Sequence, residues 1–446
     1  MQGWRRRFAV GVAAFALPAL AVAAEGSFVG PTVGGVPLEF VLFALTLAGV
    51  ALFHRHTMPI ALGGAIVIAV YKIAVSPFRT GAGFGGFFSH LGHEWVILAN
   101  LFMLLLGFGL LARYFEESRI PAVLPKYLPG DWKGGFVLLV LVFVLSSFLD
   151  NIAAAMIGGA VAATEFRGKV HVGYLAAIVA ASNAGGSGSV VGDTTTTMMW
   201  ISGIKPGEVF EAYIAAGVAL LITGFIAARQ QHALQPIAKD VEAGIRIDGW
   251  SLGVVAFILV SAIAANVAAN VFLSDAADRF PFIGTAVWAA IFIGGHVRRP
   301  DWRLVPASIK GTIFLLSLVL AASMMPVEEL PKASWQTALG LGFVSAVFDN
   351  IPLTALAIKQ GGYDWGFLAY AVGFGGSMLW FGSSAGVALS NMFSQARSAA
   401  QWLRHGWHVA VAYVVGFFVM LALIGFHPDT VPKGSAGAAP AVQQNK

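Results

Sequence analysis

The chain has 446 residues, of which 58% are hydrophobic and 11% are charged, and its mean hydropathy is +0.78. Ordinary soluble domains carry about 25% charged residues, so this composition excludes a soluble enzyme. The net charge of +5 comes from Lys and Arg residues scattered in short loops between apolar segments. That distribution indicates membrane topology and argues against a nucleic-acid partner. The chain contains no cysteine, which excludes disulfides, thiolate metal sites and cysteine nucleophiles.

The N-terminus has the three parts of a secretory signal peptide. Three arginines (Arg5, Arg6 and Arg7) precede an apolar stretch at 8–20, and small residues follow at 21–24. This pattern predicts a signal peptide over residues 1–24. An uncleaved first membrane helix is the alternative. Both interpretations place the residues near Glu25 outside the cytoplasm, so we expect the mature N-terminus to be periplasmic.

Apolar segments long enough to cross about 30 Å of hydrocarbon follow at 36–53, 58–76, 95–112, 209–228, 250–272, 281–297, 308–326 and 402–426. Four further apolar segments are interrupted, at 134–165, 172–200, 335–358 and 365–393. Three spans, two interrupted segments and one span therefore occur twice in the same order. We expect a first transmembrane repeat at 36–228, a cytoplasmic linker at 229–249, a second repeat at 250–426 and a disordered tail at 427–446.

The charged loops indicate the orientation of the two repeats. If 134–165 and 335–358 are re-entrant hairpins, each repeat crosses the membrane five times, so the second is inverted relative to the first. The loops then expected inside carry more than twice as many Lys and Arg residues as those outside. We therefore predict an all-α polytopic membrane protein. It would contain two inverted-topology repeats, each with three helices, a re-entrant hairpin, a broken helix and a further helix.

Each predicted hairpin carries an Asp-Asn pair inside its apolar segment, Asp150-Asn151 in the first and Asp349-Asn350 in the second. An ionisable side chain at bilayer depth is costly, and such groups usually mark the pathway of an ion or a substrate. Glu39 and Lys72 lie near the ends of predicted spans, where we expect them at the membrane interface.

A glycine-rich tract follows each hairpin. Placing Gly185 on Gly375 aligns the two tracts and pairs Asp193-Thr194 with Ser383-Ser384. A glycine inside a helix costs about 1 kcal/mol relative to alanine, and unwound backbone at membrane depth occurs only where it lines a cavity or is buried in protein. Close helix packing is the alternative reading. We predict breaks at the tract glycines Gly185, Gly186, Gly188, Gly192, Gly375, Gly376 and Gly382.

Three carboxylates lie deep in the apolar segments, those of Asp150, Asp193 and Asp349. Burial disfavours the charged form of a carboxylate, so such a group can exchange a proton for a metal cation near neutral pH. A helix cap is the alternative for each of them. The chain shows no nucleophile–base pair, no metal motif such as HExxH and no cofactor fingerprint. We therefore expect a protein that is not an enzyme and that needs no cofactor.

Three motifs resemble the NhaD-type sodium/proton antiporters of the ion transporter superfamily, which also holds citrate, dicarboxylate and arsenite carriers. They are Asn183-Ala-Gly-Gly with Gly192-Asp193-Thr-Thr, Ser345-Ala-Val-Phe-Asp349-Asn350-Ile-Pro352, and Gly375-Gly376-Ser377 with Gly382-Ser383-Ser384. The resemblance implies a site for small inorganic cations, sodium or lithium, and for protons. It also implies a homodimer. Adding Ser383 from the tract alignment, the predicted ion-binding residues are Asp150, Asn151, Asn183, Asp193, Thr195, Thr196, Asp349, Asn350, Ser383 and Ser384.

The motifs favour a secondary transporter of the bacterial inner membrane that exchanges sodium or lithium for protons. One departure is Ile152-Ala153-Ala154-Ala155, where such antiporters usually carry threonines. The alternative is a carrier of citrate or another organic anion. The dicarboxylate branch places Ser-Asn-Thr at both hairpin tips, whereas an Asp stands here and repels an anion unless it is protonated or paired.

Overall fold

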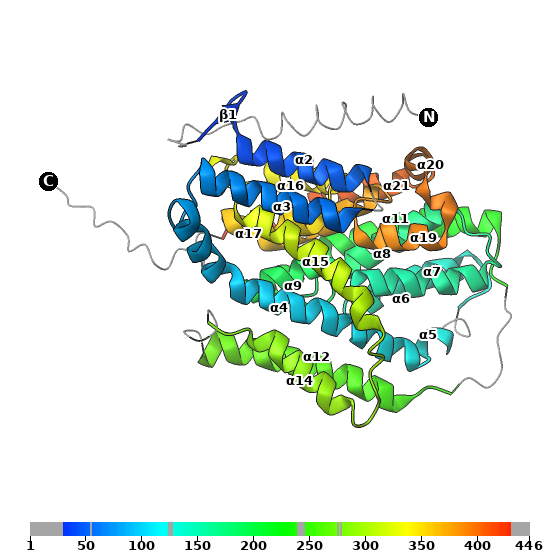
Figure 1. Cartoon of the computed structure of the whole chain (residues 1–446). Helices are drawn as coiled ribbons and strands as arrows, with labels where there is room; N and C mark the ends of the chain where they lie inside the picture. Colours follow the sequence, from blue (N-terminus) through cyan, green and yellow to red (C-terminus); the bar gives the residue numbers. More distant parts are fainter. Residues whose placement is uncertain are drawn as a thin grey trace.

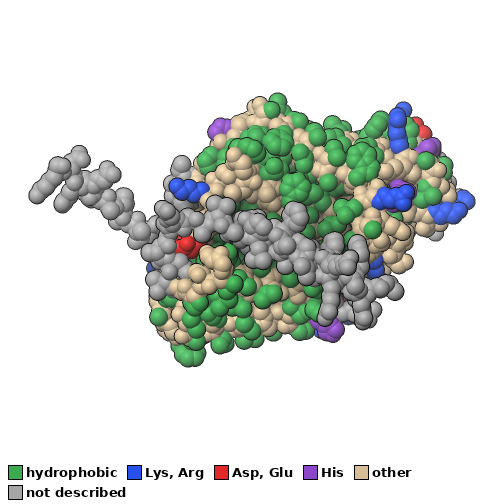
Figure 2. Space-filling view, turned by 90° about the horizontal axis from the view of Figure 1, so that it is seen from above, with side chains coloured by type: hydrophobic (Ala, Val, Ile, Leu, Met, Phe, Trp, Pro, Cys, Tyr) green, Lys and Arg blue, Asp and Glu red, His purple; other side chains and the backbone are tan. Residues whose placement is uncertain are grey.

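A computed structural model of the chain describes residues 30–53, 56–123, 128–238, 246–273, 276 and 279–429. The predicted signal peptide and most of the predicted tail lie outside these residues. Within them, six helices are long and apolar enough to cross a membrane, judged by length and composition. Figure 2 shows a largely hydrophobic face on which the Lys and Arg side chains gather toward the two ends. The described part of the chain is therefore consistent with the predicted polytopic membrane protein.

The same order of helices occurs in both halves of the chain. After a short antiparallel pair, β1 (Thr32–Val33) and β2 (Val36–Pro37), the first half contains α2 (Leu38–Leu52), α3 (Thr57–Ala74), α4 (Gly83–Glu117), α5 (Ile120–Val123), α6 (Trp132–Ser146), α7 (Asn151–Glu165), α8 (Val172–Ser187), α9 (Thr194–Ile201), α10 (Pro206–Phe210) and α11 (Ala212–Leu234). The second half contains α12 (Gly249–Phe272), α14 (Phe282–Gly294), α15 (Leu304–Ser323), η2 (Val327–Glu329), α16 (Trp335–Ser345), α17 (Asn350–Gln360), α18 (Trp365–Gly375), η3 (Gly376–Met378), α19 (Ser384–Met392), η4 (Ser394–Arg397), α20 (Ala399–His405) and α21 (Trp407–Ile424).

The first three long helices of each half form a six-helix row. Along it α2 packs on α3, α3 on α15, α15 on α4, α4 on α14, and α14 on α12. If α2 is exchanged with α12, α3 with α14 and α4 with α15, the same five contacts result. Figure 1 shows the row from α2 at the top to α12 and α14 at the bottom.

The remaining long elements form a second unit, the broken-helix body, which comprises α6 to α9, α11, α16 to α19 and α21. In it α6 packs on α8 and α16 on α18, while α8 contacts α18 and α11 contacts α21. The second helix of each hairpin contacts the far segment of the other half's broken helix, α7 with α19 and α17 with α9. The body has its own large hydrophobic core, in which Tyr174, Tyr370 and Tyr413 are fully buried. The two halves are therefore interleaved in both units.

Two predicted spans differ in their bounds from the helices at those positions. The third span, expected at 95–112, is part of α4, which begins at Gly83. Its first turns pack closely on the preceding loop. Gly86 lies so near the carbonyl of Gly81 that a Cβ would overlap it, and Thr80 Oγ1 donates to the Gly86 carbonyl at 2.9 Å. The last span, expected at 402–426, is divided into α20 and α21 at Gly406.

Glu39 and Lys72 lie near helix ends as expected, but their side chains are enclosed by protein and do not extend to the surface. The structure buries both side chains, with 0% and 5% of their surface exposed. Lys72 Nζ lies 3.8 Å from Glu39 Oε1, and Ser76 Oγ donates to the same oxygen at 2.5 Å. Opposite charges that reach each other inside the protein can be buried together, which the position of each residue near a span end does not reveal.

Candidate ion site

Each of the three predicted aspartates is the N-cap of a helix. Asp150 precedes α7, Asp193 precedes α9 and Asp349 precedes α17. In each case one carboxylate oxygen accepts a hydrogen bond from the backbone N–H two residues later, at 2.9 to 3.2 Å. The first N–H groups of a helix have no partner within it, so a carboxylate there stabilises the helix start. The capping role that the sequence left open is present in all three, and it occupies one oxygen of each carboxylate.

The second carboxylate oxygen is used differently in the two halves. Asp193 Oδ2 accepts from Asn151 Nδ2 at 2.8 Å, and the same amide donates to Asn183 Oδ1 at 3.0 Å. Asp349 Oδ2 accepts from Ser384 Oγ at 3.1 Å. Asn151, Asn183 and Asp193 thus form one hydrogen-bonded group, Asp349 forms a separate pair with Ser384, and the only bond that the Asp150 side chain shows among the described residues is its cap.

Asn183 connects the first group to the second half of the chain. Its Nδ2 donates to Ser377 Oγ at 2.9 Å and to Ser383 Oγ at 3.1 Å, and the residue is fully buried. A continuous chain of hydrogen bonds therefore runs from Asp193 through Asn151 and Asn183 to Ser383. Ser377 stands in the Gly375-Gly376-Ser377 motif but was missed as a site residue, because its contact with Asn183, 194 positions away, cannot be read from the motif.

A cavity of about 300 Å³ lies between these residues and the six-helix row. On the side of the broken-helix body its lining includes Asp150, Asn151, Asp193, Asn350 and Ser384. The opposite wall comes from α4 and α15 and is mainly apolar, with Leu101, Leu104, Leu105, Phe108, Gly109, Ser308, Gly311, Thr312 and Leu315. Asp349 is set back behind Ser384, so two of the three predicted carboxylates face the cavity directly.

The glycines place the broken helices against the hairpins. A Cβ on Gly185 or Gly192 would overlap carbonyls of α6, and one on Gly375 or Gly382 would overlap or crowd backbone of α16 or of the turn after it. Gly186 and Gly376 each face the carbonyl of the later glycine in the same tract, and Gly188 lies against the ring of Tyr213. The α-helices end after Ser187 and after Gly375, so Gly188, Gly192, Gly376 and Gly382 lie outside them, whereas Gly185, Gly186 and Gly375 are still helical and were predicted wrongly as break positions. Both interpretations of the glycine tracts therefore apply, because the glycines lie at or near the helix breaks and also allow close packing against the hairpins.

The threonines after Asp193 have different environments. Thr196 Oγ1 donates to the Ser189 carbonyl at 2.6 Å and Thr197 Oγ1 to the Val190 carbonyl at 2.9 Å, so both stabilise the break in the helix. Thr195 Oγ1 and Asn350 Nδ2 are buried without a hydrogen-bond partner among the described residues. Unsatisfied buried polar atoms are rare in native proteins and often mark a functional site.

The charges around the cavity give it a net negative character when the carboxylates are ionised. Four helices, α7, α9, α17 and α19, begin at residues next to or lining it. A helix N-terminus carries about +0.5 of an elementary charge, whereas each of the three aspartates carries a full negative charge. In the described part of the chain no three His, Cys, Asp or Glu side chains are grouped as metal ligands. A cation bound here would therefore need mixed carboxylate, hydroxyl and amide oxygens.

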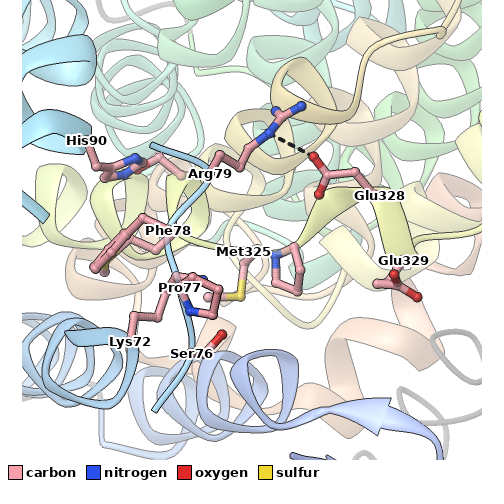
Figure 3. A pocket seen from close by; sticks show the side chains of 12 residues that line it. Lys72, Ser76, Pro77, Phe78, Arg79, His90, Met325, Glu328 and Glu329 are labelled. Atoms are coloured by element: carbon pink, nitrogen blue, oxygen red, sulfur yellow. Dashed lines mark hydrogen bonds and ion pairs between the residues drawn. The ribbon is translucent and has the colours of Figure 1, made fainter. Parts of the chain in front are cut away.

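A second cavity, of about 260 Å³, lies at the ends of α3 and α15 (Figure 3). Its two basic side chains, Lys72 and Arg79, each have an acidic side chain close by. Arg79 Nε lies 2.8 Å from Glu328 Oε1, and Lys72 lies beside the buried Glu39. Because both basic side chains are paired within the protein, we assign no anion to this cavity.

No family model matches the chain. Sodium/proton antiporter 1 of Arabidopsis thaliana is 29% identical over 313 residues, which cover 58% of this chain and 50% of the relative. The Na(+)/H(+) antiporter NhaD of Halomonas elongata is 26% identical over 64% of this chain and 66% of its own length. The NhaD protein of Alkalimonas amylolytica is 24% identical over 87% and 89%. The matched segment thus spans half of the Arabidopsis protein, and the chain is distantly similar to proteins named sodium/proton antiporters.

Proposed function

We propose that the protein is a secondary transporter of the bacterial inner membrane that exchanges sodium or lithium for protons. The observation that carries this proposal is the cavity lined by Asp150 and Asp193, which lies where the helices of both halves are broken. The names of the distant relatives support the same activity. The helix order and the exchange symmetry of the contacts support two repeats of inverted topology, with the mature N-terminus in the periplasm.

In this mechanism a cation and protons compete for the same oxygens. Ionised Asp150 and Asp193 attract a cation, and the amide and hydroxyl oxygens of Asn151 and Ser384 complete its shell in place of water. Protonation removes the negative charge and releases the cation. The apolar wall from α4 and α15 keeps the site poorly hydrated, which strengthens both interactions. Movement of the broken-helix body against the six-helix row would open the site to each side in turn.

Transport of an organic anion is the second candidate, because four helix N-termini at the cavity would favour a carboxylate substrate. The three aspartates argue against an anion, because together they carry more negative charge than the positive charge of the four helix ends, at about +0.5 each. Each would have to be protonated or paired before an anion could bind. We therefore favour cation exchange, with citrate as the anion to test.

Everted membrane vesicles test the proposal through the pH change that sodium, lithium or citrate produces. We expect exchange with sodium or lithium, more active at alkaline pH, and its loss in Asp150→Asn and Asp193→Asn. Asp131→Asn is a matched control, because Asp131 caps α6 in the same way but lies half-exposed outside the site. Full exchange in both site variants, or a response to citrate alone, would contradict the proposal.

A further inference from the structure

An ion pair joins the six-helix row to the broken-helix body. Lys359 Nζ in α17 lies 2.6 Å from Glu94 Oε1 in α4, and only 19% and 15% of the two side chains is exposed. A charge-assisted hydrogen bond at this distance is strong, and burial reduces its screening by water and salt. The neighbouring Gln360 bonds elsewhere, since its Nε2 donates at 2.7 Å to the carbonyl of Pro331 in the connection before α16.

Helix α17 connects this ion pair to the candidate ion site. Asn350, its first residue, lines the cavity, and Lys359 lies in its last turn. Its 11 residues form a rod of about 16 Å, at 1.5 Å per residue. A helix this short moves as one piece, so a displacement at Lys359 also displaces Asn350 and its neighbour Asp349.

Helix α17 also lies between two hydrophobic cores. Ile351, Ala355 and Leu356 pack in the core around α2, α3 and α15, whereas Leu353 and Ala357 pack in the core of the broken-helix body. The apolar contacts therefore hold α17 to both units. The ion pair is a directional contact that fixes it to α4 of the row.

The aligned position of the first hairpin carries no charge. Aligning Asp150 with Asp349 places Ala160, an exposed residue, at the position of Lys359. The neighbouring Gly159 instead lies against Leu389 of α19, within the body. At this position the second hairpin makes a charged contact with the row, whereas the first carries an alanine.

We propose that Glu94 and Lys359 form a latch that holds the second hairpin on α4 in this conformation and opens in each transport cycle. The pair closes when α17 lies against the row and separates when the broken-helix body moves past it. Glu94 and Lys359 are thus positioning residues for the ion site. This inference rests on the proposed function.

Cross-linking tests the latch in the full-length chain, which has no native cysteine. The double variant Glu94→Cys/Lys359→Cys is joined with a short, reducible bifunctional thiol reagent, and sodium-driven proton exchange is measured in vesicles. We expect linking to lower the exchange rate at least tenfold and reduction to restore it. The matched control is Asp248→Cys/Arg298→Cys, which replaces an ion pair of 2.8 Å within the row and whose linking should change nothing. Equal rates in linked and unlinked Glu94→Cys/Lys359→Cys would overturn the latch.

A second measurement tests the latch without any transport. Ala355 is 9% exposed at the contact of α17 with the row, so Ala355→Cys reports opening through its rate of labelling by a maleimide in purified protein. We expect Lys359→Gln to raise that rate at least tenfold, and the reversed pair Glu94→Lys/Lys359→Glu to return it to the starting value. An unchanged rate in Lys359→Gln would refute the latch, whichever ion is carried. A failure of exchange in every vesicle, with faster labelling in Lys359→Gln, would refute the proposed function and leave the latch supported.

Discussion

The two broken helices share their backbone plan but differ in chemistry. In both, glycines allow the broken helix to lie in close contact with the preceding hairpin, and a polar side chain caps the helix after the break. The first carries Asn183 and Asp193, where the aligned positions of the second carry Gly373 and Ser383. Because Gly373 has no side chain, Ser187 can pack beside it. The Cβ of Ser187 lies 3.2 Å from the point where a Cβ on Gly373 would stand. The comparison teaches that the architecture is duplicated, while the charge at the breaks is concentrated in the first half.

The helix pairs α2–α3 and α12–α14 differ in a similar way. Each begins with an acidic residue that pairs with a basic residue at or just beyond the end of the second helix, Glu39 with Lys72 and Asp248 with Arg298. The first pair is almost fully buried, whereas Arg298 and Asp248 are 43% and 28% exposed. An ion pair at a matching position is therefore buried in one half and exposed in the other. Removing it should cost much more stability in the buried case.

The largest effect is expected from Lys72→Met. It leaves the Glu39 carboxylate buried without its partner, and breaking a buried pair costs about 3–5 kcal/mol. Thermal unfolding in detergent should show a large loss of stability, and Lys72→Met/Glu39→Gln should recover most of it. If the single variant unfolds like the wild type, the two helix pairs do not differ in the way the burial indicates.

The next largest effect is expected from exchanging the caps of the broken helices. Asp193→Ser gives the first break the residue of the second, and sodium-driven exchange should fall about 100-fold or more, at about 1.4 kcal/mol per factor of ten. Ser383→Ala removes a hydrogen-bond acceptor of Asn183 but leaves both cavity-facing carboxylates in place, so the loss of exchange should be much smaller than in Asp193→Ser. Equal losses in the two variants would show that charge is not concentrated in the first half.

A smaller effect is expected from a methyl group at the matched glycines. Gly185→Ala and Gly375→Ala each place a Cβ against backbone of the neighbouring hairpin, and overpacking of this kind costs about 1–3 kcal/mol. Gly340→Ala in α16 is the control, because its Cβ would meet no atom within 4 Å and should stabilise the helix by about 0.5–1 kcal/mol. Melting temperatures that fall in one tract and not in the other would limit the shared backbone plan to one half.

The smallest effect is expected at the exposed ion pair. The hydrogen bonds from Arg298 lower the pKa of Asp248 to about 2, below its ordinary value of about 3.9. A lowered folded-state pKa stabilises the protein above the ordinary value, and this contribution disappears as the pH falls through about 2. The melting-temperature difference between wild type and Asp248→Asn should therefore be small and constant above about pH 5, and should shrink below about pH 4. A difference that grows on acidification would contradict this assignment.

Local signals in the sequence predicted the interruptions of the helices. Asp150, Asp193 and Asp349 each cap a helix, and capping and glycine content are properties of a few neighbouring residues. The turns before Asp150 and Asp349 and the helix ends at Ser187 and Gly375 therefore lie within the segments that the sequence marks as interrupted. The repeated order of elements follows from the same signals, read once in each half.

The remaining features depend on residues far apart in the chain. Asn183 reaches Ser377 and Ser383 across 194 and 200 positions, and the apolar wall of the cavity comes from α4 and α15, one from each half. The burial of Glu39 with Lys72 likewise requires α2 and α3 to pack side by side. These contacts arise from tertiary packing, which hydropathy and motif spacing do not predict.

Proton release on sodium binding to the purified protein, in weakly buffered detergent solution, tests the central claim most directly. If Asp150 and Asp193 hold either a proton or a cation, sodium should acidify the solution, and Asp193→Asn should reduce or abolish that release while Asp131→Asn leaves it unchanged. Sodium binding without any release of protons, or equal release from Asp193→Asn, would contradict the account.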